Sequence, residues 1–118
     1  MTPAPIKPLI SFDDLNKIDI RVGTILTVED VENSEKLVRL KVDFGDHKRS
    51  ILTGMKKERQ NPKIEIAGKQ ALFVVNLEPR KMAGEISEGM LFDIGYTDKV
   101  VPVLALPEKP VPNGARAG

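Results

Sequence analysis

The chain has 118 residues, 41% of them hydrophobic and 30% charged, and its formal net charge is +1. This length suits one domain, and no apolar run approaches the roughly 20 residues that a membrane-spanning helix needs. Cysteine is absent, which excludes disulfides and thiolate metal sites. The opening MTPAPIKPLI contains three prolines and no continuous apolar stretch, so we expect no signal peptide and a cytoplasmic location.

Charge is distributed unevenly along the chain. Residues 36–81 carry twelve Lys and Arg against five Asp and Glu, whereas the remaining residues carry six basic and twelve acidic side chains. A basic face on an otherwise acidic protein indicates a polyanionic partner. The alternative is a solvated surface on which the two signs mix after folding, and charge alone does not decide between the two.

The N-terminal third is expected to hold a lead, a short helix and a long strand. Residues 1–10 are proline-rich and predict an extended or disordered, flexible lead, followed by one domain over residues 11–118. SFDDLNK (11–17) predicts a short helix with Ser11 as its N-cap. From Ile18 the pattern changes to period two, and Gly23 marks a bulge or sharp coil. One face of this strand would carry Ile18, Ile20, Val22, Thr24, Leu26 and Val28.

The centre of the chain predicts a hairpin and a helical turn. Apolar residues at 38, 40, 42 and 44 alternate with polar ones, so one face of this strand should lie in the core. Gly45-Asp46 is a hairpin signal, and residues 47–53 form the returning strand. MKKERQ (55–60) predicts a short basic helical turn, which Asn61-Pro62 would stop.

The C-terminal part predicts three short strands, at residues 71–75, 90–94 and 100–104. The first is followed by the polar segment NLEPRKMAGEISEGM (76–90), which we expect to be an exposed loop. Five or six short strands with a helical connection between the third and fourth favour an all-β fold. We predict an OB-fold, a five-stranded Greek-key β-barrel with short helices and a C-terminal extension. An SH3-like barrel is the alternative, but it would not need the insert 55–69.

No residue pattern indicates catalysis. The only histidine, His47, lies beside a hairpin turn, and a single histidine does not make a metal site. The acidic pairs Asp13-Asp14 and Glu85/Glu88 are better interpreted as helix N-terminal charge and loop solvation. No glycine-rich phosphate loop, nucleophile elbow or H-E-x-x-H helix is present. We therefore expect a protein that is not an enzyme and has no cofactor.

Aromatic residues distinguish between kinds of nucleic acid. The chain has four Phe, one Tyr and no Trp, too few to stack bases along a single strand. If the partner is a nucleic acid, phosphate contacts and shape must dominate, with one or two unstacked bases read locally. That pattern favours a folded RNA.

Several segments resemble the tRNA-binding domain family. FDDLNKIDIRVGTI, ENSEKLVRLKVDFG and RSILTG are similar to its first helix and first three strands, and residues 76–90 resemble its signature N-L-x-P-R-K-M-x-G-x-x-S-x-G-M. The family includes the C-terminal appendix of methionyl-tRNA synthetases, stand-alone structure-specific tRNA-binding proteins and the secretion-associated chaperone CsaA. The resemblance covers residues 11–118. It implies an OB-fold that binds the outer corner of tRNA without chemistry, with a C-terminal segment that pairs two domains into a homodimer.

The resemblance also implies a set of contact residues. Asn76, Arg80, Lys81, Ser87 and Met90 would be the leading tRNA contacts, and Lys36, Arg39 and Arg49 the supporting electrostatic set. Some have structural alternatives: Asn76 as a cap of the strand end, Ser87 as a residue that shapes the loop, and Met90 as a core residue. Lys56 and Lys57 are interpreted as solvated residues.

Two functional hypotheses follow. The segments EKLVRL and PRKMAGEISEGM resemble the synthetase-appendix and stand-alone branches, which imply a tRNA-binding protein acting alone or in trans with an aminoacyl-tRNA synthetase. The ending PVPNGARAG resembles the CsaA branch, which implies a chaperone for unfolded protein. A chaperone would need an exposed apolar groove, and the dimer seam is the expected place for it.

Overall fold

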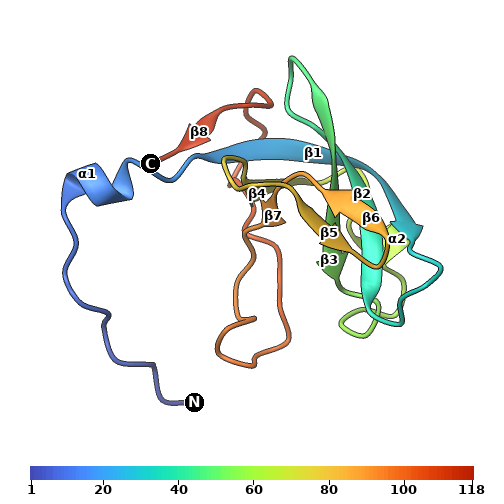
Figure 1. The fold of residues 1–118 in the computed structure, drawn as a ribbon, viewed down its shortest axis with the longest axis horizontal. Coiled ribbons are helices and arrows are strands. Elements are labelled where there is room, and N and C mark those ends of the chain that lie inside the picture. The colour runs from blue at the N-terminus through green and yellow to red at the C-terminus, as the bar shows by residue number, and fades with distance from the viewer.

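The computed structural model describes all residues 1–118 and shows short antiparallel strands wrapped around one core (Figure 1). Two short helices accompany the strands, and no helix has the length and apolar character needed to cross a membrane. The elements are α1 (Phe12–Leu15), β1 (Ile20–Asp30), β2 (Leu37–Asp43), β3 (Lys48–Gly54), α2 (Pro62–Glu65), β4 (Gln70–Val74), β5 (Arg80–Met82), β6 (Glu85–Ser87), β7 (Met90–Leu91) and β8 (Arg116–Ala117).

The main sheet has the strand order β3-β2-β1-β4-β7. The long strand β1 pairs with β4 through its first half and with β2 through its second half. Two hydrogen bonds of 2.9 Å then connect β3 to the end of β6: the Glu88 N–H donates to the Ser50 carbonyl, and the Leu52 N–H donates to the Ser87 hydroxyl. This circular order, with α2 between β3 and β4, is that of an OB barrel, so the predicted fold class is confirmed.

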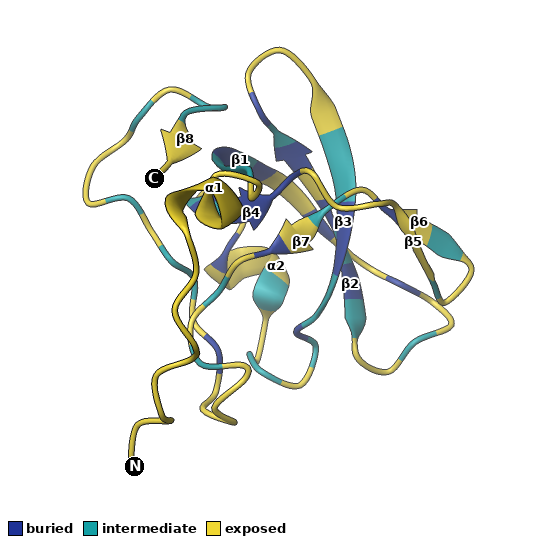
Figure 2. Ribbon diagram, turned by 60° about the vertical axis from the view of Figure 1, so that its left-hand side comes forward, coloured by how far each residue is buried: buried dark blue, intermediate teal, exposed yellow.

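The barrel interior is apolar, as the alternation in β2 predicts. Val38, Leu40, Val42 and Phe44 are all buried, and the ring of Phe44 meets Phe73 edge to face at 5.5 Å between centroids. Figure 2 shows the buried residues gathered on β1 to β4, whereas the N-terminal segment with α1 is exposed.

The faces of β1 differ from the prediction. The pairing of β1 with β2 shifts between Ile25 and Thr27, and this bulge exchanges the inward and outward faces of the strand. Ile25 therefore points into the core, while Leu26, predicted to share one face with Val22 and Val28, is exposed. Gly23 is not the bulge itself; a Cβ there would lie 2.5 Å from Cγ1 of Val42. A glycine is needed at this point because β1 and β2 approach closely.

The helix between β3 and β4 begins where the sequence predicted a stop. Residues 55–60 form turns without a helix, and α2 starts at Pro62. Proline suits the first turn of a helix because its missing N–H would be unpaired there anyway. The first predicted helix is confirmed in a shorter form, with the Ser11 hydroxyl accepting a hydrogen bond from the Asp14 N–H at 3.1 Å.

Residues 76–90 contain a hairpin, where we predicted only a loop. Strands β5 and β6 pair, and Ala83 and Gly84 form the turn with φ of 49° and 82°. Downstream, the predicted strand 100–104 is reduced to one bridge between Val103 and Ile94. The tail then returns to the barrel, because β8 pairs with the start of β1.

Candidate nucleic-acid interface

An open hollow of about 800 Å³ lies on one side of the barrel. We call it the barrel hollow; its walls come from the β1–β2 loop, the end of β3 with the turn that follows, the hairpin β5–β6, and residues 90–98. OB barrels bind oligonucleotides on the face of their second and third strands, between the flanking loops. The barrel hollow occupies this position.

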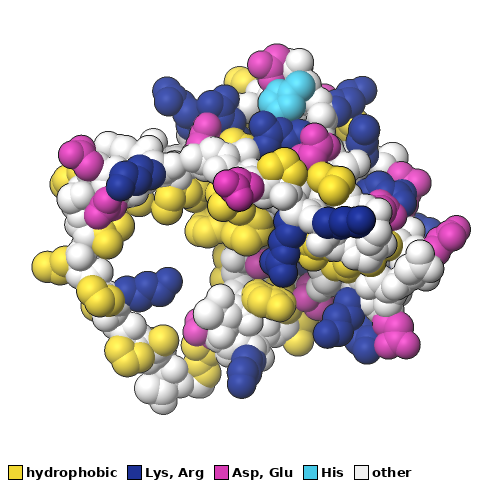
Figure 3. Space-filling view, viewed as in Figure 1, with side chains coloured by type: hydrophobic (Ala, Val, Ile, Leu, Met, Phe, Trp, Pro, Cys, Tyr) yellow, Lys and Arg dark blue, Asp and Glu magenta, His cyan; other side chains and the backbone are white.

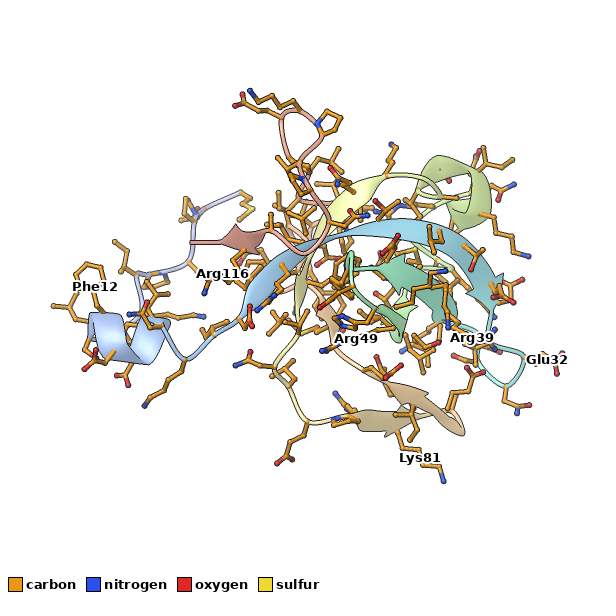
Figure 4. All side chains as sticks on the ribbon, turned by 90° about the horizontal axis from the view of Figure 1, so that it is seen from above. Phe12, Glu32, Arg39, Arg49, Lys81 and Arg116 are labelled. Carbon is orange, nitrogen blue, oxygen red and sulfur yellow. The ribbon has the colours of Figure 1, made fainter.

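Four exposed cations lie on the segments that form or flank the barrel hollow, and two of them, Lys36 and Lys57, line it. Lys36 is exposed and makes no ion pair, and Nζ of Lys57 lies 3.9 Å from an Oε2 of Glu35. Arg80 and Lys81 are exposed on β5 and make no ion pair. Side chains alternate along a strand, so Arg80 shares a face with Met82, which lines the hollow, while Lys81 lies on the opposite face. Figure 4 shows Lys81 extending away from the hairpin.

Arg39 has a structural role that the sequence did not indicate. Its Nε and Nη2 donate to the two carboxylate oxygens of Glu85 at 2.7 and 2.9 Å, and its Nη1 lies 3.4 Å from Glu29. The hydrogen bond from Arg39 lowers the pKa of the Glu85 carboxyl. The pair ties β6 to β2, so the charge of Arg39 is largely neutralised within the protein.

Arg49 is likewise committed to the fold. Its Nη1 donates to the carbonyls of Val75 at 2.7 Å and Glu88 at 3.1 Å, and its Nε donates to Nε2 of His47 at 2.9 Å. These bonds join the start of β3 to the segments that follow β4 and β6. In Figure 4 Arg49 lies centrally, over the sheet, whereas Lys81 and Phe12 lie at the periphery of the molecule.

Asn76 joins two distant parts of the chain. Its Oδ1 accepts a hydrogen bond from the Asp19 N–H at 2.9 Å, and its Nδ2 donates to the Lys17 carbonyl at 2.6 Å. It therefore binds backbone groups, as its structural alternative supposed, but those of the segment before β1 and not those of its own strand end.

Ser87 is a structural residue, as its alternative interpretation supposed, whereas Met90 is exposed and not part of the core. Ser87 is only 3% exposed, and its hydroxyl accepts from the Leu52 N–H and donates to the Gly89 carbonyl at 3.0 Å. Both bonds hold the barrel closed, so its side chain is not on offer to RNA. Met90 is 46% exposed and lines the barrel hollow. The core-packing interpretation of Met90 is wrong because its neighbour Leu91 takes the inward position of β7.

The structure adds residues that sequence reasoning did not select. Phe92 and Tyr96 are exposed and line the barrel hollow, together with the half-buried acids Glu58 and Asp93. Burial raises the pKa of both carboxyls. No local signal indicated their exposure, because Phe92, Ile94 and Tyr96 alternate with Asp93, Gly95 and Thr97, a pattern that favours a strand with a buried apolar face.

Lys56 is not the solvated residue that the sequence suggested, because its ammonium group is bound within the protein. Its Nζ donates to the carbonyls of Val31 at 3.0 Å and Ser34 at 2.6 Å, which fixes the β1–β2 loop. These bonds hold the β1–β2 loop in place. Lys36, the last residue of this loop, lines the barrel hollow.

An OB barrel with exposed cations and exposed aromatic residues around one hollow is typical of oligonucleotide-binding domains. The family described as "Putative tRNA binding domain" matches residues 20–116. The chain therefore belongs to the tRNA-binding domain family, and the predicted resemblance is confirmed.

Individual relatives agree with this membership. The methionine–tRNA ligase of Parabacteroides distasonis is 41% identical over 111 residues, which cover 94% of this chain and 16% of the ligase. The chain thus spans about a sixth of that relative. The crystal structure of a MetRS-related protein from Pyrococcus horikoshii superposes with a TM-score of 0.85 at 37% identity, covering 95% of this chain and 100% of the other. The chaperone CsaA from Bacillus anthracis superposes with a TM-score of 0.79 at 26% identity, covering 94% and 100%.

Proposed function

We propose that this protein is a non-catalytic, structure-specific tRNA-binding protein that recognises the outer corner of tRNA. The observation that carries the proposal is the barrel hollow, which Lys36, Lys57 and the exposed Tyr96 line in a family named for tRNA binding. Cations placed around a concave face neutralise phosphates of a folded RNA, and one aromatic stacks a base that leaves the helix.

The proposed action is in trans to an aminoacyl-tRNA synthetase, in the cytoplasm. Support comes from the 41% identity to part of a methionine–tRNA ligase and from the likeness to a MetRS-related protein. A separate domain that holds tRNA by its outer corner leaves the acceptor end accessible to an enzyme.

We also propose that two copies form a homodimer. Residues 1–18, which we call the N-terminal arm, are all exposed, and Ile6 and Leu9 are 96% and 97% exposed. The arm projects from the barrel on the side where the C-terminus lies (Figure 1), and hydrophobic side chains line it in Figure 3. In the proposed dimer a second copy packs against the arm, the loop 94–106 and the C-terminal tail of the domain 11–118. These contacts would cover the exposed apolar surface.

The dimer is tested by sedimentation velocity. Replacing Phe12 and Leu15 by Ser should shift the protein to monomer, because both side chains are exposed on α1. Ile64→Ser is a control, since Ile64 is also a highly exposed apolar residue but lies on α2, away from the arm. A wild-type protein that sediments as a monomer at micromolar concentration would contradict the dimer.

The tRNA proposal is tested by one titration with three ligands: tRNA, an unstructured RNA of the same length and an unfolded peptide, each at low and moderate salt. The expected result is preferential tRNA binding that weakens steeply with salt, because phosphate contacts release counterions. Equal affinity for both RNAs would remove the claim that structure is recognised.

A CsaA-like chaperone is the second candidate, favoured by the exposed apolar residues of the N-terminal arm and by the likeness to CsaA structures. In the same titration, peptide binding in the absence of tRNA binding would support the chaperone and overturn the first proposal.

A further inference from the structure

Two acidic residues that line the barrel hollow, Asp93 and Asp98, make no ion pair. Asp93 is half-buried, whereas Asp98 is exposed to solvent. The other half-buried acid, Glu58, pairs with Nη1 of Arg59 at 3.3 Å, and Nη2 of Arg59 donates to the Pro102 carbonyl at 3.4 Å. Arg59 is thereby held by other partners, and the carboxylate of Asp93 keeps acceptor capacity on the hollow side.

The surroundings of Asp93 combine three kinds of group. Tyr96, three residues further on, is 71% exposed and offers an aromatic face. Lys36 and Lys57 contribute positive charge to the same hollow. Its volume of about 800 Å³ lies within the range of about 300–1,000 Å³ found for small-molecule sites. An aromatic face, a two-oxygen acceptor and nearby ammonium groups match the base, the base edge and the phosphate of one nucleotide.

The acceptor selects among bases. On its Watson–Crick edge guanine presents two neighbouring N–H donors, from N1 and N2, which fit the two oxygens of one carboxylate. Adenine and cytosine each present one amino group beside an acceptor nitrogen, and uracil presents one N–H between two carbonyls. Each of these would place a lone pair against the carboxylate. Only guanine gives a bidentate, charge-assisted contact.

We propose that the barrel hollow binds one unpaired guanine nucleotide of the RNA, with the base on Tyr96, its N1–H and N2–H on Asp93, and its phosphate toward Lys36 and Lys57. The proposal rests on the proposed tRNA-binding function and names the base that this site selects. It assigns a role to Asp93 and Tyr96, two residues that the signature 76–90 does not include.

The electrostatics of Asp93 are consistent with such a ligand. Burial raises the pKa of its carboxyl, which means that the folded protein replaces its lost hydration only in part. Two N–H donors from a base would supply the missing hydrogen bonds, so the binding of guanine and the ionisation of Asp93 should favour each other.

Tyr96 makes the proposal measurable with isolated nucleotides. It is the only tyrosine of the chain, so its ring gives a single, unambiguous set of aromatic resonances in NMR spectra. GMP, AMP, CMP and UMP are titrated at pH 7 and constant ionic strength, and the Tyr96 ring shifts are followed. We expect GMP to bind roughly tenfold more tightly than the other three, as good bidentate contacts discriminate. Equal affinities, or a preference for another base, overturn the proposal.

Two variants separate the acceptor from the stacking face. Asp93→Asn should remove the preference for GMP, whereas Glu108→Gln, which makes the same charge change on an exposed tail residue, should keep it. Tyr96→Leu should weaken the binding of all four nucleotides. Because this variant lacks the tyrosine ring, its titrations are followed by the backbone amide resonance of Asp93. A GMP preference that survives in Asp93→Asn overturns the assignment of Asp93.

The tRNA titration of the wild type keeps the two claims apart. If tRNA binds and the four nucleotides are equivalent, the guanine inference fails and the tRNA-binding function stands. If GMP is preferred and tRNA does not bind, the guanine site stands and the proposed function fails.

Discussion

Arg39 and Glu85 form a two-point ion pair that connects β2 to β6, with Nε–Oε1 and Nη2–Oε2 separations of 2.7 and 2.9 Å. These residues are 46 positions apart in the chain. The pair fixes the hairpin β5–β6 against the barrel, and the hairpin carries Met82, which lines the barrel hollow, and Arg80 on the same face of β5. The family resemblance placed Arg39 in the supporting electrostatic set for tRNA. In the structure Arg39 instead positions the hairpin that flanks the barrel hollow.

The ion pair predicts the behaviour of two single variants. Arg39→Ala should weaken tRNA binding because the hairpin is no longer held. Glu85→Ala removes a negative charge and releases the guanidinium, yet it should also weaken binding, by the same loss of positioning. Affinities for tRNA at one fixed salt concentration check this. Tighter binding by Glu85→Ala would show that Arg39 is a phosphate contact that Glu85 restrains.

Asp93 predicts a pH-dependent stability. Because burial raises the pKa of its carboxyl above the ordinary value of 3.8, the folded state holds this proton more strongly than the unfolded state. The stability that Asp93 contributes is therefore greatest below pH 3.8 and is lost as pH rises through the raised pKa. At pH 7 the Asp93→Asn variant should unfold at a higher urea concentration than the wild type. The difference between their unfolding midpoints should shrink toward pH 4. A constant difference across this range would contradict the assignment.

Ser87 predicts a loss of stability without a specific loss of binding. Ser87→Ala leaves the Leu52 N–H unpaired in a buried position, which costs about 1–3 kcal/mol. Urea denaturation measures the change, and the salt dependence of tRNA binding by the folded protein should not move. Ser50→Ala, on the same strand β3, is the control. Its hydroxyl makes no hydrogen bond within the protein, so its unfolding should stay close to that of the wild type.

Arg80 and Lys81 are predicted to differ although they are adjacent. Arg80 lies on the face of β5 that Met82 shares, and Lys81 extends away from the hairpin. Arg80→Ala should lower the slope of log affinity against log salt concentration by about 1, as the loss of one phosphate contact does. Lys81→Ala should leave the slope close to that of the wild type. Equal reductions of the slope by the two variants would mean that the RNA contacts both faces of the hairpin.

The sequence predicted the barrel because its strongest signals are local. The alternation of Val38, Leu40 and Val42 determines an inward face whatever the neighbouring strands do, and turn residues separate the strands. The prediction failed at Leu26, where a bulge exchanges the two faces, since an extra residue in a strand leaves no mark in a two-residue period. It also failed at Pro62, where the same residue type can stop a helix or start one.

The candidate site was predictable only in part, for a related reason. Lys36 and Arg80 are exposed and make no ion pair, as expected of contact residues, although Glu35 and Glu78 lie close to them in sequence. The ion pair of Arg39 with Glu85 depends on contacts between distant segments, which charge counting does not reveal. The barrel hollow forms only when the barrel closes. The position of Asp93 and Tyr96 in its wall therefore could not be predicted from the sequence.

The central claim is that folded tRNA binds at the barrel hollow through its phosphates. The most direct test is the salt dependence of tRNA affinity for three proteins: the wild type, Lys36→Ala/Lys57→Ala, and the charge-matched Lys69→Ala/Lys109→Ala, whose lysines are exposed but do not line the hollow. We expect the first double variant to lower the slope by about 2 and the second to leave it unchanged, because each lost phosphate contact lowers the slope by about 1. Equal slopes for the two double variants would contradict the claim and place the RNA elsewhere on the protein.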